Sequence, residues 1–390
     1  MTGLPPLSRF LLVYGALYAG YGVQSPYLPL LLGEHGLAPA SIGLMLAAGG
    51  AIKLVAGPVA GRIADRTAAP HAVLAICAGV AALLAPLYLF ASGFLPLLLV
   101  VLCQMAALAP LAPLTDSLAL GAAAPKERRS LGFDYGWVRG AGSAAFILGS
   151  LLAGAAIARA GTGVIVGMQA ALLALAGFAA SFLAPPPPPT QHEPEVTRHG
   201  FRTLLAMPLF RRAMLVAALI LGSHAMHDSF AVIRWREAGI GADTAGILWS
   251  ESVAAEVVVF FLLGRPLLDR LGIAGAVALA ALAAILRWGV MAETASIPAV
   301  ALIEPLHGLS FALLHLACMR LMAEIVPRPL AATALALYGT LAIGAATSLM
   351  TLASGPLYGR LGAHGFWAMA ALAGLGLLLA PTLRTKQAWR

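Results

Sequence analysis

Charged residues are scarce in this chain of 390 residues: Asp, Glu, Lys and Arg make up 10% of it, whereas hydrophobic residues make up 61%. A soluble domain carries charge on about a quarter of its residues to cover its surface. The composition therefore excludes a soluble globular protein and predicts that lipid is the solvent for much of the chain. Because lipid offers backbone groups no hydrogen-bond partner, helix bundles and closed barrels are the structures that remain.

The alternation of apolar and polar residues that marks a barrel strand is also lacking. The apolar runs are continuous and about 20 residues or longer, which lets a helix cross a hydrocarbon layer of ~30 Å. When the runs are divided at polar residues or at Gly and Pro, they predict an all-α membrane protein with twelve transmembrane helices. The predicted helices span 8–32, 40–65, 71–91, 94–121, 131–159, 161–184, 206–233, 242–264, 272–292, 297–322, 329–354 and 362–383.

Cysteine is rare, and Cys77, Cys103 and Cys318 all lie in apolar runs without the spacing of a disulfide framework or a metal site. A nucleotide-binding Gly-x-x-x-x-Gly-Lys-Ser/Thr motif is absent, so we expect no cofactor and a proton gradient as the energy source. A nucleophile–base set is also lacking, which argues against an enzyme. The short loops argue against a membrane sensor, and the first apolar run lacks a cleavage site and is interpreted as a retained helix.

A change of composition divides the chain. Five consecutive prolines begin at Pro185 and are followed by a polar stretch that ends near Gly200. Prolines remove backbone donors and favour an extended, semi-rigid spacer. We therefore predict an N-terminal six-helix bundle (1–184), a cytoplasmic linker (185–202) and a C-terminal six-helix bundle (203–390).

The net charge of +8 could indicate nucleic acid as a partner, but the basic residues recur in alternate loops instead of forming one patch. Basic residues gather on the cytoplasmic side of membrane proteins. With the N-terminus in the cytoplasm, that side receives Arg62, Arg66, Lys126, Arg128, Arg129, Arg198, Arg202, Arg211, Arg212, Arg265, Arg270, Arg328, Arg384, Lys386 and Arg390. The opposite loops receive Arg159, Arg234, Arg236 and Arg360. We predict an inner-membrane protein with both termini in the cytoplasm and no nucleic-acid partner.

The two halves contain similar turns after the second and the eighth predicted helices. The first contains Gly61, Asp65 and Arg66, and the second runs from Gly264 to Asp269 and Arg270. Recurrence in register indicates a parallel internal repeat. We interpret the acidic and basic residues as a conformational latch on the cytoplasmic side; a plain loop turn is the alternative.

Two six-helix halves, a central linker and the Gly-x-x-x-Asp-Arg turn resemble the major facilitator superfamily over essentially the whole chain. The segment from Phe133 to Gly142, the triplet Leu286-Arg287-Trp288 and the triplet Leu306-His307-Gly308 narrow the resemblance to the branch of the phenylpropionate transporter, lactose permease and nucleoside–proton symporters. The resemblance implies transport by alternating access and a coupling role for Arg287 and His307. Glu304 and Ser310 depart from the lactose permease pattern, which has a lysine and an acidic residue there, so the network must be rewired.

An ionisable residue inside a membrane helix costs at least ~2.5–3.5 kcal/mol on insertion scales, and its default interpretation is functional. Asp116 and Arg139 on neighbouring helices either form a structural pair or contact a solute, since a guanidinium matches a carboxylate with two hydrogen bonds. Predicted proton-coupling residues are Asp116, Asp228, Glu256, Arg287 and His307. Structural hydrogen bonds between helices are the alternative for His224 and His227, and an ion pair with Arg287 or Lys53 for Glu256. His307 and His315, eight residues apart, are predicted to share a helix face, with one of them lining the cavity.

Tyr14, Tyr18 and Tyr21 share one face of the first helix, which either packs against a neighbour or lines the solute cavity. Predicted substrate-binding residues are Tyr14, Tyr18, Gln24, Asp116, Arg139, His227, Trp249 and His307. We predict a monomeric secondary transporter that takes up a small organic solute with protons, with an aromatic or other organic acid as the candidate. A proton-coupled exporter and a nucleoside or sugar symporter are the alternatives. Drug–proton antiporters of the superfamily that this chain resembles usually carry Gly-Pro pairs midway along the fifth helix, and the segment from Gly149 to Gly154 contains no proline, which weakens the exporter.

Overall fold

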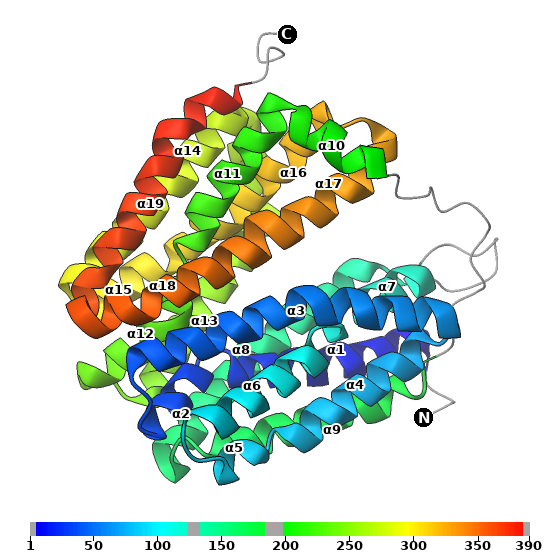
Figure 1. Ribbon diagram of the computed structural model, residues 1–390, viewed down its shortest axis with the longest axis vertical. Coiled ribbons are helices and arrows are strands. Elements are labelled where there is room, and N and C mark those ends of the chain that lie inside the picture. The colour runs from blue at the N-terminus through cyan, green and yellow to red at the C-terminus, as the bar shows by residue number, and fades with distance from the viewer. Residues whose placement is uncertain (1–4, 124–132, 184–197, 385–390) are drawn as a thin grey trace. The chain divides into compact units, whose positions relative to one another are not determined.

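The computed structural model describes residues 5–123, 133–183 and 198–384 (Figure 1). Within these ranges the chain forms helices and no strand, so the all-α prediction is confirmed. Many large apolar side chains lie on the outside, among them Leu83, Phe90 and Leu302, which are 79%, 82% and 78% exposed. Such an apolar surface suits a lipid environment and not water.

The chain divides into two compact units. Unit 1 comprises Met1–Leu37, Ala48–Thr190 and Gly241–Ser250, and unit 2 comprises Ala38–Ala47, Gln191–Ile240 and Glu251–Arg390. The α-helices of the first half are α1 (Pro6–Gln24), α2 (Leu28–Glu34), α3 (Pro39–Thr67), α4 (Pro70–Leu84), α5 (Leu87–Phe90), α6 (Phe94–Leu108), α7 (Leu111–Ala123), α8 (Tyr135–Ala160) and α9 (Val164–Ala180).

The second half adds short π-helical and 3-10 segments to its α-helices. The α-helices are α10 (Arg198–Ala206), α11 (Pro208–Gly222), α12 (Ala225–Glu237), α13 (Ala242–Val258), α14 (Gly264–Glu293), α15 (Ile297–Ile303), α16 (Leu314–Ile325), α17 (Ala331–Leu337), α18 (Ala346–Leu361) and α19 (Phe366–Leu379). The π segments are η1 (Val259–Leu263), η3 (Gly308–Leu313) and η5 (Tyr338–Ala345). The 3-10 segments are η2 (Glu304–Leu306), η4 (Arg328–Leu330), η6 (Gly362–Gly365) and η7 (Ala380–Leu383).

Eight helical stretches of the described chain are long and apolar enough to cross a membrane. Two of them, Ala242–Glu293 with 52 residues and Arg328–Leu383 with 56, exceed twice the length that one crossing needs. Gly272 and Gly362 interrupt these stretches with φ of +64° and +54°, a backbone conformation that favours glycine. Each stretch therefore makes two passes, and α1 and α9 complete twelve passes within the described residues.

The predicted helix positions agree with these passes, and the clearest differences lie at helix ends. The prediction ends a helix at Ser354, before Gly355 and Pro356, but α18 continues through Pro356 to Leu361. Neighbouring helices and local adjustments satisfy the backbone groups that a proline frees inside a membrane bundle. Proline is thus a weaker stop signal here than in a soluble helix.

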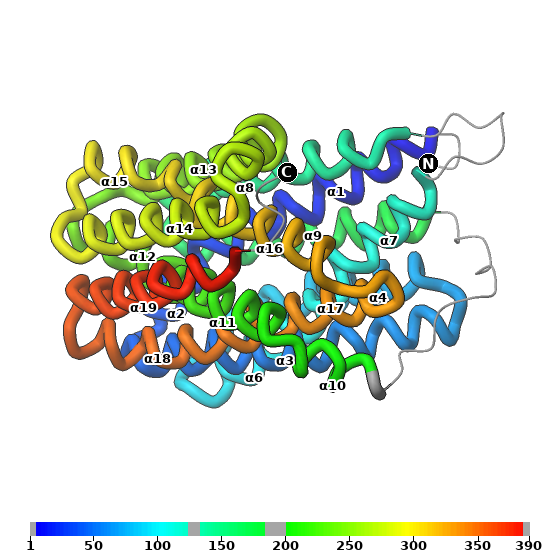
Figure 2. The backbone as a smooth tube through the Cα atoms, turned by 90° about the horizontal axis from the view of Figure 1, so that it is seen from above, coloured from blue at the N-terminus to red at the C-terminus, as the bar shows by residue number. Residues whose placement is uncertain are grey.

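Helices at corresponding positions in the two units pack on corresponding neighbours (Figures 1 and 2). In unit 1, α1 packs on α8 and α9, and α4 packs on α9 and α6. In unit 2, α11 packs on α18 and α19, and α14 packs on α19 and α16. Matching contacts between matching helices establish the predicted pseudo-symmetric halves.

Two glycines set the tightest crossing in unit 1, between α1 and α8. A Cβ added to Gly22 would overlap the backbone of Phe146, and one added to Gly149 would overlap the backbone of Ala19. Small residues let helix backbones approach closely where no hydrophobic force drives them together. This crossing places the tyrosines of α1 next to the first turns of α8.

Candidate functional site

A cluster of tyrosines surrounds one carboxylate in unit 1. The Asp116 cluster consists of Tyr14 and Tyr18 from α1, Asp116 from α7, and Tyr135 and Arg139 from α8. The hydroxyls of Tyr14 and Tyr135 both donate to Oδ1 of Asp116, at 2.5 Å and 3.0 Å. Asp116 is thus an acceptor for two hydroxyls, and no ion pair joins it to Arg139 among the described residues.

Arg139 has a hydrogen-bond donor from which no described residue accepts. Its guanidinium carbon lies 5.0 Å from the ring centroid of Tyr18, a cation–π arrangement. Its Nη1 atom is buried and has no hydrogen-bond partner among the described residues. Because an unpaired buried donor is costly, an acceptor from outside the cluster would stabilise this site. The predicted neighbours Asp116 and Arg139 do share one site, and the contact of Arg139 with a solute stays a prediction.

Gln24, another predicted substrate ligand, lies in a ladder of buried amides. Its Nε2 donates to Oε1 of Gln104 at 2.7 Å, and Nε2 of Gln104 donates to Oε1 of Gln169 at 3.3 Å. The three side chains come from α1, α6 and α9 and are all buried. The amide of Gln24 is therefore engaged in joining helices, and its contact with a solute stays a prediction.

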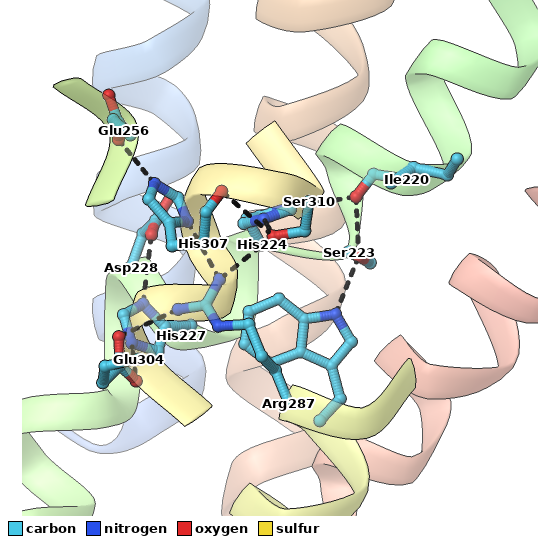
Figure 3. A network of polar contacts seen from close by, with 11 residues as sticks. Ile220, Ser223, His224, His227, Asp228, Glu256, Arg287, Glu304, His307 and Ser310 are labelled. Carbon is cyan, nitrogen blue, oxygen red and sulfur yellow. Dashed lines mark hydrogen bonds and ion pairs between the residues drawn. The ribbon is translucent and has the colours of Figure 1, made fainter. Parts of the chain in front are cut away.

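A larger charged cluster lies in unit 2 (Figure 3). The Arg287 network consists of His227 and Asp228 from α12, Glu256 from α13, Arg287 from α14, and Glu304 and His307 around the break between α15 and η3. Nη2 of Arg287 lies 2.9 Å from Oε2 of Glu304, and both side chains are 0% exposed. A charge buried this completely needs a partner, and here the two neutralise each other.

His307 links this buried pair to Glu256. Nη1 of Arg287 lies 2.9 Å from Nδ1 of His307, and Nε2 of His307 lies 2.6 Å from Oε1 of Glu256. A guanidinium can only donate, so Nδ1 must accept and the single ring proton must be on Nε2. The ring therefore donates to Glu256, whose side chain is 23% exposed.

His227 links the same pair to Asp228. Its Nε2 lies 3.0 Å from Oε1 of Glu304, and its Nδ1 lies 3.4 Å from Oδ1 of Asp228. Both nitrogens face carboxylates, so both donate only when the ring carries two protons. Because the side chain of Asp228 is 51% exposed, the network runs from an exposed carboxylate, through the buried pair, to a second accessible carboxylate.

Neutral side chains hold the network in place. Nδ1 of His224 donates to the carbonyl of Ile220 at 3.0 Å, so its Nε2 accepts from Ser310 at 3.0 Å. Ser310 is also within 3.4 Å of Nη1 of Arg287. Nε1 of Trp288 donates to Ser223 at 2.9 Å, and the guanidinium of Arg287 lies 4.6 Å from the Trp288 ring centroid. His224 thus forms hydrogen bonds between helices, and its part in proton coupling stays a prediction.

The predicted site omitted Glu304, Ser310 and Tyr135. Glu304 and Ser310 occupy positions where the family pattern has a lysine and an acidic residue, so the resemblance directed attention away from them. The signal that could have identified Glu304 is its charge inside an apolar run. Tyr135 gave less signal, because a tyrosine at the start of a membrane helix is common at the interface.

The remaining predicted residues lie outside both clusters. Trp249 is buried in α13. His315 contacts Tyr338 through its Nδ1 at 3.3 Å, and the π segment η3 intervenes between His307 and His315. Among the described residues no group of three or more His, Cys, Asp and Glu is placed to hold a metal ion.

The predicted latch residues lie at helix ends and differ between the units. Asp65 and Arg66 are exposed near the end of α3, and a Cβ on Gly61 would meet nothing within 4 Å. Asp269 accepts from Nη1 of Arg320 at 2.6 Å, which ties α14 to α16, while Arg270 is exposed. Their role in a conformational change stays a prediction.

The chain is similar to transporters in sequence and in structure. Residues 6–369 match the description "MFS_1 like family". The chain is 31% identical over 383 residues to a protein of Escherichia coli (strain K12) named "Probable 3-phenylpropionic acid transporter", covering 94% of this chain and 95% of that protein. It is 27% identical over 383 residues to a protein of Geobacillus stearothermophilus named "Maltose permease", covering 97% and 95%.

Solved structures of the same fold include the nucleoside transporter NupG, with a TM-score of 0.77, 18% identity and coverage of 97% of this chain and 98% of that one. A bacterial homologue of the human lysosomal transporter Spinster has a TM-score of 0.74 with 16% identity, covering 98% of each chain. At these identities the likeness concerns the fold alone.

Proposed function

The chain belongs to the MFS_1 like family of major facilitator transporters, and from that premise we propose that it takes up a small organic acid together with a proton. It is an integral membrane transporter and not an enzyme. Coupling to protons, the class of solute and the direction of transport form the proposal. The proposal also includes the inner membrane as location, cytoplasmic termini, the monomeric state and the absence of a cofactor.

The observation that carries the proposal is the balance of charge in the Arg287 network. Asp228, Glu256 and Glu304 supply three carboxylates, and Arg287 supplies the one permanent cation. With neutral histidines these groups carry two negative charges in excess, so two protons neutralise the network, and His227, facing two carboxylates, accommodates one of them. The other is the proton that we assign to transport.

Glu256 is the best placed acceptor for that second proton. Protonation of His307 on both nitrogens would break its bond from Arg287, which costs the buried guanidinium one of its acceptors. Protonation of Glu256 leaves that bond intact and removes one negative charge. Because Glu256 is partly exposed, a proton reaches it from water. The imidazole of His307, 2.6 Å from Glu256, transmits the change of charge to the buried pair of Arg287 and Glu304.

The Asp116 cluster supports an anionic solute. Arg139 has a buried Nη1 without a partner among the described residues, and a carboxylate accepts two parallel hydrogen bonds from a guanidinium. The stacked rings of Tyr14 and Tyr18, 5.6 Å apart, offer an aromatic surface beside it. An aromatic carboxylic acid satisfies both features, and the relative named for 3-phenylpropionic acid agrees with this class.

A neutral solute is the second candidate. The relative named maltose permease matches nearly the whole chain, and Asp116 with its two hydroxyl donors could accept from a sugar or nucleoside hydroxyl. An unpaired arginine donor is harder to explain with a neutral solute, because it then gains a weaker, uncharged acceptor. An exporter would use the same groups in the opposite direction.

Transport into proteoliposomes tests the proposal. Proteoliposomes that contain the purified protein are given an inward proton gradient and radiolabelled 3-phenylpropionate, maltose or uridine. We expect accumulation of 3-phenylpropionate above equilibrium, lost when a protonophore collapses the gradient. Accumulation of maltose or uridine alone would establish the second candidate, and uptake unaffected by the protonophore would refute proton symport.

A further inference from the structure

An apolar groove with one arginine in its wall lies in unit 2, and no member of the Arg287 network lines it. The α10 groove has a volume of about 260 Å³ and is lined by Leu205, Phe210, Arg211, Met214, Leu215, Ala218, Leu341 and Ala342. The lining comes from α10, α11 and the π segment η5. Apart from Arg211 every lining side chain is aliphatic or aromatic, so the groove suits a hydrocarbon chain and offers a peptide backbone no partners.

Helix α10 lies at this groove as a short amphipathic helix. It packs on α11 and α17, with Leu204 fully buried and Gly200 beside Leu330. Phe201 and Leu205, one turn apart on the same face, are 42% and 43% exposed. Exposed apolar side chains next to basic ones are typical of a helix that lies at the boundary between lipid headgroups and acyl chains.

The charged side chains that the structure describes on α10 and α11 are all arginines. Arg202, Arg211 and Arg212 are exposed and form no ion pair among the described residues. The groove lining contains no acidic side chain. All three arginines lie on the side predicted to face the cytoplasm, where anionic lipids attract basic residues next to a membrane helix.

We propose that the α10 groove binds one anionic phospholipid, with an acyl chain along the apolar wall and the phosphate held by Arg211, assisted by Arg202 and Arg212. A zwitterionic lipid would bring a cation to the same arginines and is disfavoured. Because the groove wall joins α10, α11 and η5, the lipid fastens α10 to the bundle. The lipid site goes beyond solute transport, and the proposal of this site does not require the proposed transport function.

Native mass spectrometry of the full-length protein, extracted from nanodiscs that contain phosphatidylcholine and phosphatidylglycerol, tests the site. We expect one phosphatidylglycerol to be retained by the wild type. Arg211→Gln should lower its retention about fivefold, the effect of one basic residue near an anionic surface. Ala218→Phe should fill the groove and lower retention without changing charge, while Arg265→Gln, an arginine that is 92% exposed and outside the groove, should leave retention unchanged.

The two groove variants separate a built site from general attraction. Full retention in Ala218→Phe, with an unfolding temperature equal to that of the wild type, would overturn the groove. Equal retention of phosphatidylcholine and phosphatidylglycerol by the wild type would overturn the role of the arginines. Equal losses in Arg211→Gln and Arg265→Gln would reduce the effect to unspecific surface charge and overturn the proposal as well.

Discussion

Arg287 donates toward Glu304, His307 and Ser310 from a position that water does not reach. Burying this charge is costly, and the carboxylate of Glu304 offsets the cost. The arginine therefore couples the two ends of the network: whatever changes the charge of His307 or Glu304 changes the environment of the one fixed cation between them.

Removing the charge of Glu304 should destabilise unit 2. Glu304→Gln leaves the Arg287 guanidinium buried without a counter-ion, a change that costs about 3–5 kcal/mol in comparable buried pairs. Thermal unfolding in detergent measures it, with Arg320→Gln as the control, since that variant breaks exposed pairs with Asp269 and Glu324 that are each worth at most about 1 kcal/mol. Equal shifts in the two variants would contradict the central place of the buried pair.

Glu256 should decide whether transport is coupled to protons. Glu256→Gln keeps the volume and removes the titratable group, so we expect exchange of labelled for unlabelled solute to continue while gradient-driven accumulation is lost. Counterflow and accumulation are measured side by side in proteoliposomes. Glu293→Gln is the control, because Glu293 accepts from Trp367 at the surface of the same unit and contacts no member of the Arg287 network within the described part of the chain. Accumulation that survives in Glu256→Gln would assign the proton elsewhere.

Arg139 should select for anionic solutes. Loss of a charge-assisted hydrogen bond costs about 1.5–3 kcal/mol, so Arg139→Gln is expected to raise KM for 3-phenylpropionate about tenfold or more. Arg159→Gln on the same helix is the control, since Arg159 is exposed and donates to the carbonyl of Ala155. If Arg139→Gln raised KM equally for maltose or uridine, the carboxylate assignment would fail.

At the scale of elements, unit 2 departs from regular helix where the network lies. Glu256 precedes η1 by three residues, His307 directly precedes η3, and these two π segments contact each other. A Cβ on Gly308 would lie 2.5 Å from the carbonyl oxygen of Ala255. The tight crossing at Gly308 is therefore what brings Glu256 within reach of His307. Interruptions of this kind are frequent at functional sites.

Widening this crossing should uncouple the pair. Gly308→Ala forces the helices apart, so we expect reduced proton-driven accumulation together with a lower unfolding temperature. Gly339→Ala is the control, because Gly339 lies in the π segment η5 and an added Cβ there meets nothing within 4 Å. The same uptake assay and thermal scan serve both variants, and unchanged accumulation in Gly308→Ala would show that the crossing does not position the pair.

The elements also show where sequence reasoning succeeds and stops. Continuous apolar runs predicted the twelve passes, because length and polarity decide whether a helix crosses a membrane. The π segments and the run of α18 past Pro356 were not predicted, since both depend on how neighbouring helices satisfy the backbone. Most members of the Arg287 network were identifiable as charges in apolar runs. Their pairing was not identifiable, because Arg287 and Glu304 come from consecutive helices and are brought together by the packing of those helices.

At the scale of the whole molecule, the two units have matching helix contacts but different polar interiors. Unit 1 contains the Asp116 cluster with an arginine available for a ligand, and unit 2 contains the nearly self-satisfied Arg287 network. This difference supports a division of labour, with solute binding assigned to unit 1 and proton binding to unit 2. A repeat that duplicates a scaffold leaves each copy free to acquire its own charges.

The most direct test of the central claim is the proton flux that accompanies solute entry. Proteoliposomes with a trapped pH-sensitive dye receive whichever of the three labelled solutes the protein transports, and protein-free liposomes correct for passive entry of the acid. The account predicts that the interior acidifies in step with solute entry in the wild type, whereas Glu256→Gln admits solute without acidification. Solute entry through the wild-type protein with no acidification above the protein-free level would contradict it.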